Sequence, residues 1–282
     1  MILLKLQGGL GNQMFQYATG LALSKKLNTK LNLDLRFYSQ DYSKKNTTAR
    51  EYELDCFSLQ SNHLHKSLVK GFEILAYKQW LNFSLFEEKE DDFNPEVNSL
   101  SGNIYLIGNW QSEKYFKEYK DLIRKSFEFI RTLSEKNMTM LEKIKKTNSV
   151  SVHVRRTDYV QDAQISKVHQ VCDLDYYKCA IKKLSRNVKN PNFFVFSDDI
   201  KWCKQNLKTK YSTTYVDHNT KGYHDMRLMS QCQHNIIANS SFSWWGAWLN
   251  NNPKKIVIAP RRWFKNRDLN PSDRFPSGWI TI

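Results

Sequence analysis

The chain is poor in cysteine, and its few cysteines show no pairing pattern. They are Cys56, Cys172, Cys179, Cys203 and Cys232, which is an odd number with no Cys-x-x-Cys spacing. This distribution argues against a disulfide framework and against a zinc site. A reducing, cytoplasmic compartment fits such a set of thiols best.

Long apolar runs, internal repeats and low-complexity tracts are also absent. The apolar N-terminus is soon interrupted by Gly8-Gly9-Leu10-Gly11-Asn12-Gln13, so it is too short for a signal-peptide core or a membrane span. We therefore expect a cytoplasmic protein that approaches lipid at most peripherally, at the inner membrane face. With 282 residues, 40% of them hydrophobic and 25% charged, the chain is large enough for two modest domains.

Acidic residues are outnumbered by basic ones. There are 28 Asp and Glu against 43 Lys and Arg, which gives a formal net charge of +15 and favours anionic partners. Nucleic acid is disfavoured, because the lysines are dispersed over predicted helices and no RNA- or DNA-binding signature is present. Phosphorylated small molecules and an anionic membrane surface, where lipid-linked glycans reside, are the partners left.

Short apolar strands alternate with helical patterns, most regularly in the second half. Strands are predicted at 1–6, 29–35, 104–108, 149–155, 192–197, 213–217, 234–238 and 255–259. Helices are predicted at 12–27, over most of 112–147, and near 174–187, 199–207, 223–232 and 243–251. This alternation predicts doubly wound, mostly parallel sheets, with a domain boundary near residue 148.

The most informative segment is His153-Val154-Arg155-Arg156-Thr157-Asp158-Tyr159, at the end of the strand predicted over 149–155. In open α/β sheets, ligands bind beyond the carboxyl ends of the strands. The guanidinium fork of arginine fits two phosphate oxygens at once and keeps its charge. The segment therefore predicts a diphosphate clamp. The alternative is a surface ion pair between Arg156 and Asp158, which alone would contribute little.

Two strand-to-helix turns could hold an anion. The glycine-rich turn over 8–13 lets the backbone approach a ligand closely at a helix N-terminus, although a plain turn with Asn12 as a cap is the alternative. Ser240 and Ser241 precede an aromatic helix, where hydroxyls and free N–H groups can hold phosphate. The alternative there is simple capping, and the tryptophans of that helix, Trp244, Trp245 and Trp248, are interpreted as core.

The paired Asp198 and Asp199 end the strand predicted over 192–197. One reading is a Mg²⁺ or Mn²⁺ site against a nucleotide diphosphate. The pair lacks an intervening residue and starts a helix directly, so we favour helix capping and dipole compensation. No metal is then required, because Arg155 and the serines would neutralise the diphosphate.

Taken in chain order, six segments resemble the α-1,2-fucosyltransferases of glycosyltransferase family 11. They are Gly8-Gly9-Leu10-Gly11-Asn12-Gln13-Met14-Phe15-Gln16-Tyr17-Ala18, Trp110-Gln111-Ser112-Glu113-Lys114-Tyr115-Phe116, 153–159, Phe196-Ser197-Asp198-Asp199, 235–248 and Pro260-Arg261-Arg262-Trp263-Phe264. Each segment alone is a weak signal. Their order and their spread over nearly the whole chain make the set specific.

The resemblance implies an α/β fold of the GT-B type, with two Rossmann-like domains and the active site in the cleft between them. Residues 1–148 would form the acceptor-side domain and residues 149–282 the donor-binding domain. GDP-fucose would be the donor, and a galactose-terminated oligosaccharide or lipid-linked glycan the acceptor. Inversion at the fucose C1 and independence of metals and cofactors are implied too. Without the membrane anchor of animal members, the chain resembles a bacterial cytosolic form.

The resemblance also assigns roles to residues of the donor-binding domain. Arg155 is similar to the family's diphosphate arginine, with His153 and Arg156 shaping the same pocket. Asp225 resembles the acid that reads the guanine edge, and a carboxylate is suited to accept from two adjacent guanine N–H groups. Ser240 and Ser241 resemble the phosphate-binding hydroxyls, and Phe242 completes this part of the site.

The remaining assignments concern the N-terminal turn and the general base. Asn12 and Gln13 would present amides to the fucose and the phosphate, with Gly9 in the same turn. Asp158 is the nearest carboxylate to accept the galactose O2 proton, although orienting the arginines is an equally good role for it. Stabilisation of the leaving GDP by Arg155 would then matter more. The residues alone do not separate GDP-fucose from another nucleotide sugar such as GDP-mannose.

Overall fold

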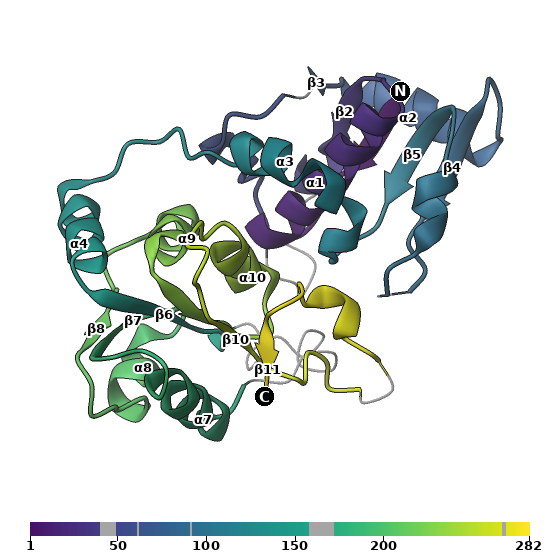
Figure 1. Ribbon diagram of the computed structural model, residues 1–282. Coiled ribbons are helices and arrows are strands. Elements are labelled where there is room, and N and C mark those ends of the chain that lie inside the picture. The colour runs from purple at the N-terminus through teal and green to yellow at the C-terminus, as the bar shows by residue number, and fades with distance from the viewer. Residues whose placement is uncertain (40–48, 61, 91, 158–171, 267–268) are drawn as a thin grey trace. The chain divides into compact units, whose positions relative to one another are not determined.

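The computed structural model describes residues 1–39, 49–60, 62–90, 92–157, 172–266 and 269–282. They form two compact units, each with its own sheet (Figure 1). The N-terminal unit is Met1–Arg131 with Ser272–Arg274, and the C-terminal unit is Thr132–Pro271 with Phe275–Ile282. All strand pairs in both sheets are parallel, as the sequence predicts.

The N-terminal unit has a five-stranded sheet in the order β3-β2-β1-β5-β4. Its strands are β1 Ile2–Lys5, β2 Leu31–Asp34, β3 Asn62–His63, β4 Phe83–Glu87 and β5 Asn103–Ile107. Its α-helices are α1 Leu10–Lys26, α2 Lys66–Tyr77 and α3 Lys120–Ser126. Its 3₁₀ turns are η1 Arg36–Ser39, η2 Leu54–Cys56, η3 Pro95–Ser99, η4 Glu113–Tyr115, η5 Lys117–Tyr119 and η6 Ser272–Arg274.

Helix α1 follows β1 through a turn that requires glycine. Gly8 has φ +77°, and a Cβ there would lie 2.8 Å from the Asn12 amide nitrogen. Both observations exclude a side chain at this position. Gly20, further along α1, would place a Cβ within 3.0 Å of Leu4 and Leu31, so the helix packs closely over β1 and β2.

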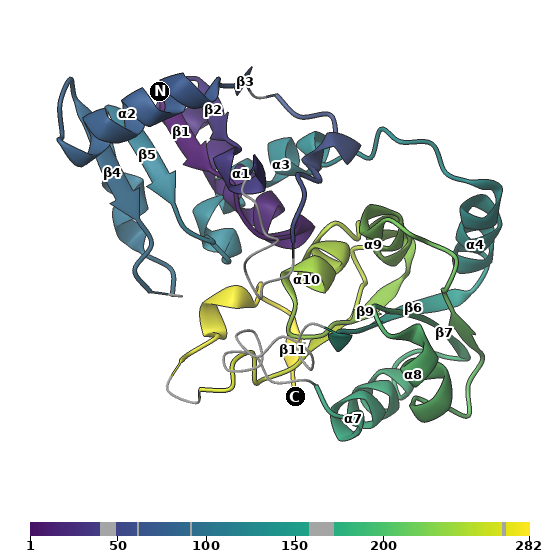
Figure 2. The same cartoon turned by 180° about the vertical axis from the view of Figure 1, so that it is seen from behind.

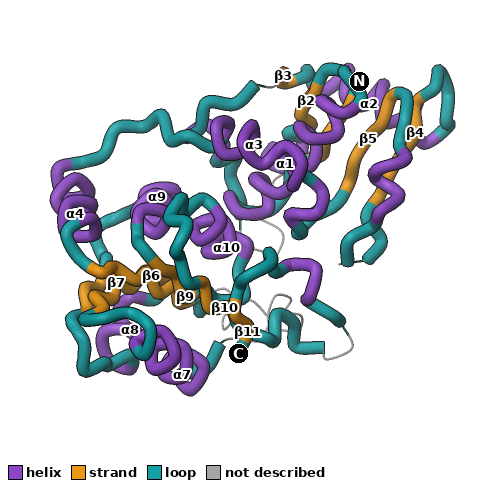
Figure 3. Tube along the Cα trace, in the orientation of Figure 1, coloured by secondary structure: helices purple, strands orange, loops and turns teal. Residues whose placement is uncertain are grey.

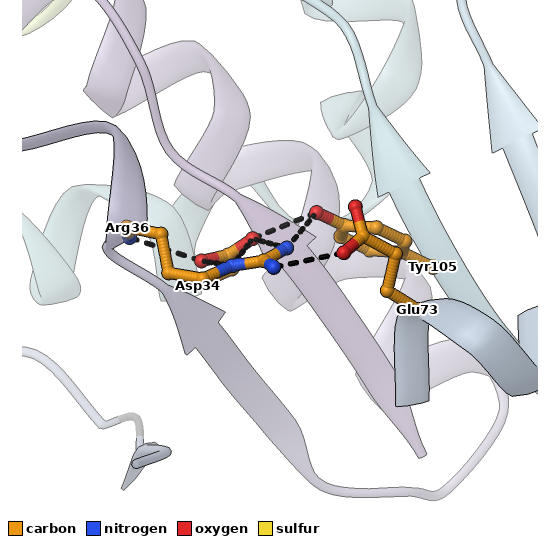
Figure 4. Close-up of polar contacts among 4 residues, drawn as sticks. All are labelled: Asp34, Arg36, Glu73 and Tyr105. Carbon is orange, nitrogen blue, oxygen red and sulfur yellow. Dashed lines mark hydrogen bonds and ion pairs between the residues drawn. The ribbon is translucent and has the colours of Figure 1, made fainter. Parts of the chain in front are cut away.

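A buried ion-pair network joins β2, β5 and α2 (Figure 4). Arg36 donates from Nε and Nη2 to the two oxygens of Asp34 at 3.0 and 2.9 Å, and from Nη1 to Glu73 at 2.8 Å. Tyr105 donates to the same Asp34 at 2.7 Å. Burial alone would raise the pKa of Asp34, but the hydrogen bonds from Arg36 and Tyr105 outweigh it and hold that pKa below its usual value. The network thus fixes α2 to the sheet.

The C-terminal unit has a six-stranded sheet in the order β11-β10-β9-β6-β7-β8. Its strands are β6 Asn148–Val154, β7 Pro191–Ser197, β8 Thr213–Tyr215, β9 His234–Ile236, β10 Val257–Ala259 and β11 Ile280–Thr281. Its helices are α4 Glu135–Lys145, α7 Leu174–Ser185, α8 Ile200–Asn206, α9 Gly222–Gln231 and α10 Ser241–Trp248. Trp244, Trp245 and Trp248 are buried and in ring contact, which confirms their interpretation as core.

The structure differs from the sequence prediction in three respects: the extent of one helix, several elements that were not predicted, and the domain boundary. The helix over most of 112–147 is wrong for residues 127–134, where the chain runs without a helix between α3 and α4 (Figure 3). The short strands β3, β4 and β11 and the helix α2 were not predicted. The units separate between Arg131 and Thr132, so α4 belongs to the C-terminal unit, whereas the boundary predicted near residue 148 assigned it to the other. No helix of the described residues is long and apolar enough to cross a membrane.

Candidate active site

Residues 155–157 follow β6, and we call them the arginine loop. They are held in place by Asp198 at the end of β7. One carboxylate oxygen of Asp198 accepts from the backbone N–H of Arg156 at 2.9 Å, and the other accepts from that of Thr157 at 3.0 Å. The Arg155 Nε lies 3.4 Å from the same carboxylate. Because β6 and β7 are paired in register up to Val154 and Ser197, the two strand ends meet at the same edge of the sheet. The loop is therefore a defined structure that presents Arg155 beyond the sheet.

Arg156 is directed toward α8. Its Nε lies 3.6 Å from Asp199, and its guanidinium stacks 3.9 Å from the centre of the Trp202 ring. Asp199 also caps α8 by accepting from the Trp202 N–H at 3.1 Å, which confirms the capping prediction for this residue. For Asp198 that prediction is wrong, because its oxygens serve the arginine loop rather than the helix.

Ser240 and Ser241 stand at the beginning of α10, directly beyond β9. Since β9 pairs with β6, this helix start and the arginine loop lie at neighbouring strand ends. Ser240 is the N-cap residue and is buried, yet within the described part of the chain its hydroxyl makes no capping hydrogen bond. The predicted alternative of simple capping is therefore not what this hydroxyl does. A phosphate group at this helix start would meet backbone N–H groups and two hydroxyls.

Phe242 connects the two strand ends to α9. Its ring centroid lies 5.3 Å from that of His153, which is a buried residue of β6. A Cβ at Gly222, the first residue of α9, would lie 3.2 Å from the Phe242 ring. These contacts place His153, Phe242 and the beginning of α9, the helix that carries Asp225, close to one another.

Asp225, in the first turn of α9, is the end of a chain of side-chain hydrogen bonds. Asn219 donates to Asp225 Oδ1 at 2.7 Å, and Asn137 of α4 donates to Asn219 Oδ1 at 2.7 Å. His218 Nε2 lies 2.9 Å from Asn137 Oδ1. Burial raises the pKa of Asp225 to about 7, although the hydrogen bond from Asn219 opposes this shift. A half-buried carboxyl with so perturbed a pKa is a candidate for a functional role.

The predicted residues of the N-terminal unit are arranged around the beginning of α1. Gly9 is the N-cap residue, so Asn12 lies inside the first turn and the alternative of Asn12 as the cap is wrong. Asn12 Oδ1 accepts from Gln111 at 2.9 Å, and Gln111 in turn accepts from Arg274 at 3.0 Å. The carboxylate of Glu53 accepts from the Leu10 N–H at 2.9 Å, so a protein group already occupies part of this helix start.

Gln13 is fully buried and makes three hydrogen bonds within its unit. Its amide nitrogen donates to the carbonyls of Gly8 at 3.0 Å and Glu51 at 2.8 Å, and its amide oxygen accepts from the Glu53 N–H at 2.9 Å. These bonds hold the segment of residues 51–53 against the glycine turn. They describe a structural role, and the predicted contact of Gln13 with the donor stays a prediction.

The predicted base, Asp158, lies outside the described residues. Among the residues that are described, no group of three or more His, Cys, Asp or Glu side chains is arranged to hold a metal ion. Sequence reasoning missed the residues that position the predicted ones, above all Asp198, Asn219, Asn137 and Gln111. Asp198 and Gln111 lay in segments that the family resemblance had marked, but neither was assigned this positioning role.

Comparisons with known proteins identify the family of the chain. A family model described as glycosyl transferase family 11 matches residues 1–282. The chain is 39% identical over 293 residues to the alpha-1,2-colitosyltransferase of Escherichia coli, covering 100% of this chain and 98% of that protein. It is 26% identical over 258 residues to the galactoside 2-alpha-L-fucosyltransferase Sec1 of Mus musculus, covering 88% of this chain and 64% of the mouse protein.

Among solved structures, the chain is similar to that of Arabidopsis thaliana FUT1 mutant R284K in complex with GDP. The TM-score is 0.52 with 11% sequence identity, over 99% of this chain and 75% of that chain. Two α/β units, each with a parallel sheet, and this similarity show a fold of the GT-B type, as predicted. The chain belongs to glycosyl transferase family 11, and the predicted membership of this fucosyltransferase family is confirmed.

Proposed function

We propose that the protein transfers L-fucose from GDP-fucose to the 2-hydroxyl of a terminal galactose, with inversion at the fucose C1. The observation that carries the proposal is the cluster at neighbouring strand ends of the C-terminal unit. It combines an arginine loop, a serine-rich helix start and a half-buried carboxyl, which are groups that suit a guanosine diphosphate. The α-1,2 linkage and the galactoside acceptor rest on the names of the relatives.

In this proposal each group has one task. Arg155 and the start of α10 bind the diphosphate, and Asp225 accepts from the guanine N–H groups. The galactose O2 forms a bond to the fucose C1 while the bond from C1 to the phosphate oxygen breaks. The O2 proton goes to a base, for which Asp158 is the predicted residue. Charge develops on the departing β-phosphate, so the arginine contributes most in the transition state.

The second candidate donor is GDP-colitose, and the 39% identity to a colitosyltransferase favours it. Colitose is fucose without its 3-hydroxyl, so the two donors differ by one polar group. A site that binds the 3-hydroxyl by buried hydrogen bonds rejects the deoxy sugar strongly. A site lined by apolar groups discriminates against the added hydroxyl only about 100-fold or less.

The test is a donor panel with a β-galactoside acceptor, assayed by GDP release and by NMR of the product linkage. We expect α-1,2 transfer from GDP-fucose, with GDP-mannose and UDP-galactose inactive. Higher kcat/KM for GDP-colitose than for GDP-fucose would assign the second candidate. Activity that is lost with EDTA and restored by Mn²⁺ would contradict the predicted metal independence.

A further inference from the structure

We propose that the outer face of α2 and the turn after it dock the protein on an anionic phospholipid membrane. The surface consists of Lys66, Lys70, Ile74, Tyr77, Trp80 and Leu81, which we call the docking surface. It lies in the N-terminal unit and does not depend on the identity of the sugar donor. Four features of this surface support the proposal.

The first feature is an unusual concentration of exposed apolar side chains. The exposed fractions are 47% for Ile74, 61% for Tyr77, 58% for Trp80 and 78% for Leu81. The spacing of Lys66, Lys70, Ile74 and Tyr77 by four, four and three residues places them on one side of the helix. Large apolar and aromatic side chains gathered in this way mark an interaction surface.

The second feature is the turn that presents Trp80 and Leu81. Gln79, Leu81 and Asn82 all have left-handed backbone conformations, with φ of 54°, 53° and 57°. Such conformations are unfavourable for residues other than glycine, and they persist where the surroundings hold them. Here the Trp80 N–H bonds to the Leu75 carbonyl at 3.0 Å and the Phe83 N–H to the Trp80 carbonyl at 3.0 Å. The turn therefore holds two large apolar side chains in solvent.

The third feature is the anchoring of the helix on its inner face. Figure 2 shows α2 lying along one face of the sheet, where it packs against β4 and β5. Phe72 stacks on the buried Phe83 with ring centroids 5.4 Å apart. Glu73 is bound to Arg36 in the network with Asp34 (Figure 4). The docking surface thus belongs to a helix, α2, that is fixed to the sheet.

The fourth feature, charge, identifies the partner. Glu73 is the one acidic residue of α2, and its charge is paired with that of Arg36. The outward charges are Lys66 and Lys70, together with Lys78, whose ammonium lies 4.6 Å from the centre of the Trp80 ring. Lysines beside Trp, Tyr and aliphatic side chains are the composition of helices that bind at the membrane interface. Anionic headgroups complement these lysines, whereas a second copy of the same surface would place lysine against lysine.

The test is sedimentation of the full chain with phosphatidylcholine vesicles, with and without phosphatidylglycerol. We expect binding to the anionic vesicles that weakens at high salt, and binding to pure phosphatidylcholine at least ~10-fold weaker, since each lysine near an anionic surface strengthens binding about five-fold. A Trp80→Ser, Leu81→Ser double variant should bind the anionic vesicles at least ~10-fold more weakly. Parent-like binding by this variant would overturn the proposal.

Two matched controls separate the docking surface from general effects. Leu68, 54% exposed, lies on α2 about 180° around the helix from Tyr77, so Leu68→Ser should bind like the parent. Replacing Lys66 and Lys70 with Gln should weaken binding, whereas Gln at the exposed Lys182 and Lys183 of α7 removes the same charge and should not. Equal losses in both lysine pairs would overturn the assigned location.

The alternative is that the docking surface binds a second copy of the protein, and a separate measurement tests it. Analytical ultracentrifugation of the parent and the Trp80→Ser, Leu81→Ser variant would reveal a dimer that only the parent forms. That result would overturn the membrane proposal. Transfer to a soluble galactoside serves as the folding check, because none of the substituted residues belongs to the candidate active site. We expect it to be unchanged in every variant.

Discussion

Each unit of this protein contains an arginine paired with an aspartate, and the two pairs differ in how the arginine is satisfied. In the N-terminal unit, Arg36 makes two hydrogen bonds to Asp34 and a third to Glu73, all at 3.0 Å or less. In the C-terminal unit, Asp198 spends its two oxygens on backbone N–H groups, and Arg155 approaches it only to 3.4 Å. In the first arrangement the carboxylates bind the arginine side chain, whereas in the second the aspartate holds the backbone of the loop that carries the arginine.

The pKa values of two carboxyls, Asp34 in the N-terminal unit and Asp225 in the C-terminal unit, show the same contrast. The cation beside Asp34 holds its pKa below the usual value, so the pair stabilises the fold at neutral pH and this stability is lost as the pH falls in acid. Burial raises the pKa of Asp225 to about 7, so its neutral form favours folding and that stability is lost as the pH rises through about 7. A compensated carboxyl is structural, whereas a carboxyl with a raised pKa is a candidate for a functional role.

The largest effect should come from removing the structural arginine. Arg36→Met leaves the buried Asp34 without its cation, which should lower the free energy of unfolding by about 3–5 kcal/mol. The matched control is Arg131→Met, which breaks the exposed pair with Asp55 and should lower it by less than about 1 kcal/mol. Urea unfolding measures both. Similar losses in the two variants would remove the distinction between the pairs.

The next effect should be catalytic and should leave stability nearly unchanged. Arg155→Lys keeps a charge but loses the fork that grips two phosphate oxygens, so kcat should fall at least ~100-fold. Arg156→Lys is the neighbouring control and should lose less, because Arg156 is occupied by Asp199 and Trp202. GDP release at saturating donor measures both. Near-normal turnover by a folded Arg155→Lys variant would refute the diphosphate clamp.

These pairs also show what the sequence could predict. The strand ending in Arg155 was visible because regular alternation and β-branched residues mark buried parallel strands. The hydrogen bonds of Asp198 could not be predicted from the sequence, because they join loops that are about forty residues apart and leave no periodic pattern. The two-residue strand β3 was missed for a similar reason, since it is too short for any period to appear. Helix α2 was missed because its apolar residues are shared between a buried and an exposed face.

A smaller effect, on binding rather than turnover, should follow from Asp225→Ala. A guanine contact made equally in the ground and transition states affects KM more than kcat. We expect the KM for GDP-fucose to rise roughly ten- to hundred-fold, with kcat within a few-fold of the parent. Asp225→Asn should be milder, because its amide oxygen still accepts one guanine donor. Loss of kcat with unchanged GDP affinity would instead place Asp225 in the chemistry.

The smallest effect concerns Asn219, the hydrogen-bond donor to Asp225. Asn219 donates to its carboxylate at 2.7 Å and thereby opposes the rise of its pKa. Asn219→Ala should raise the pKa of Asp225 further, so less of the carboxyl is ionised near neutral pH. GDP affinity, measured by calorimetry at pH 7, should fall about three- to ten-fold, the value of one ordinary hydrogen bond.

The pH profile separates this effect from damage to the fold. In the parent, GDP affinity should decline as the pH is lowered through about 7, where Asp225 takes up a proton. In Asn219→Ala the decline should begin at higher pH, and affinity should recover at mildly alkaline pH as the carboxyl ionises and while the guanine N–H groups are still protonated. Asn206→Ala, which removes an asparagine hydrogen bond on α8, should keep the parent profile. A loss in Asn219→Ala that is the same at every pH would mean that Asn219 supports the loop and does not tune the carboxyl.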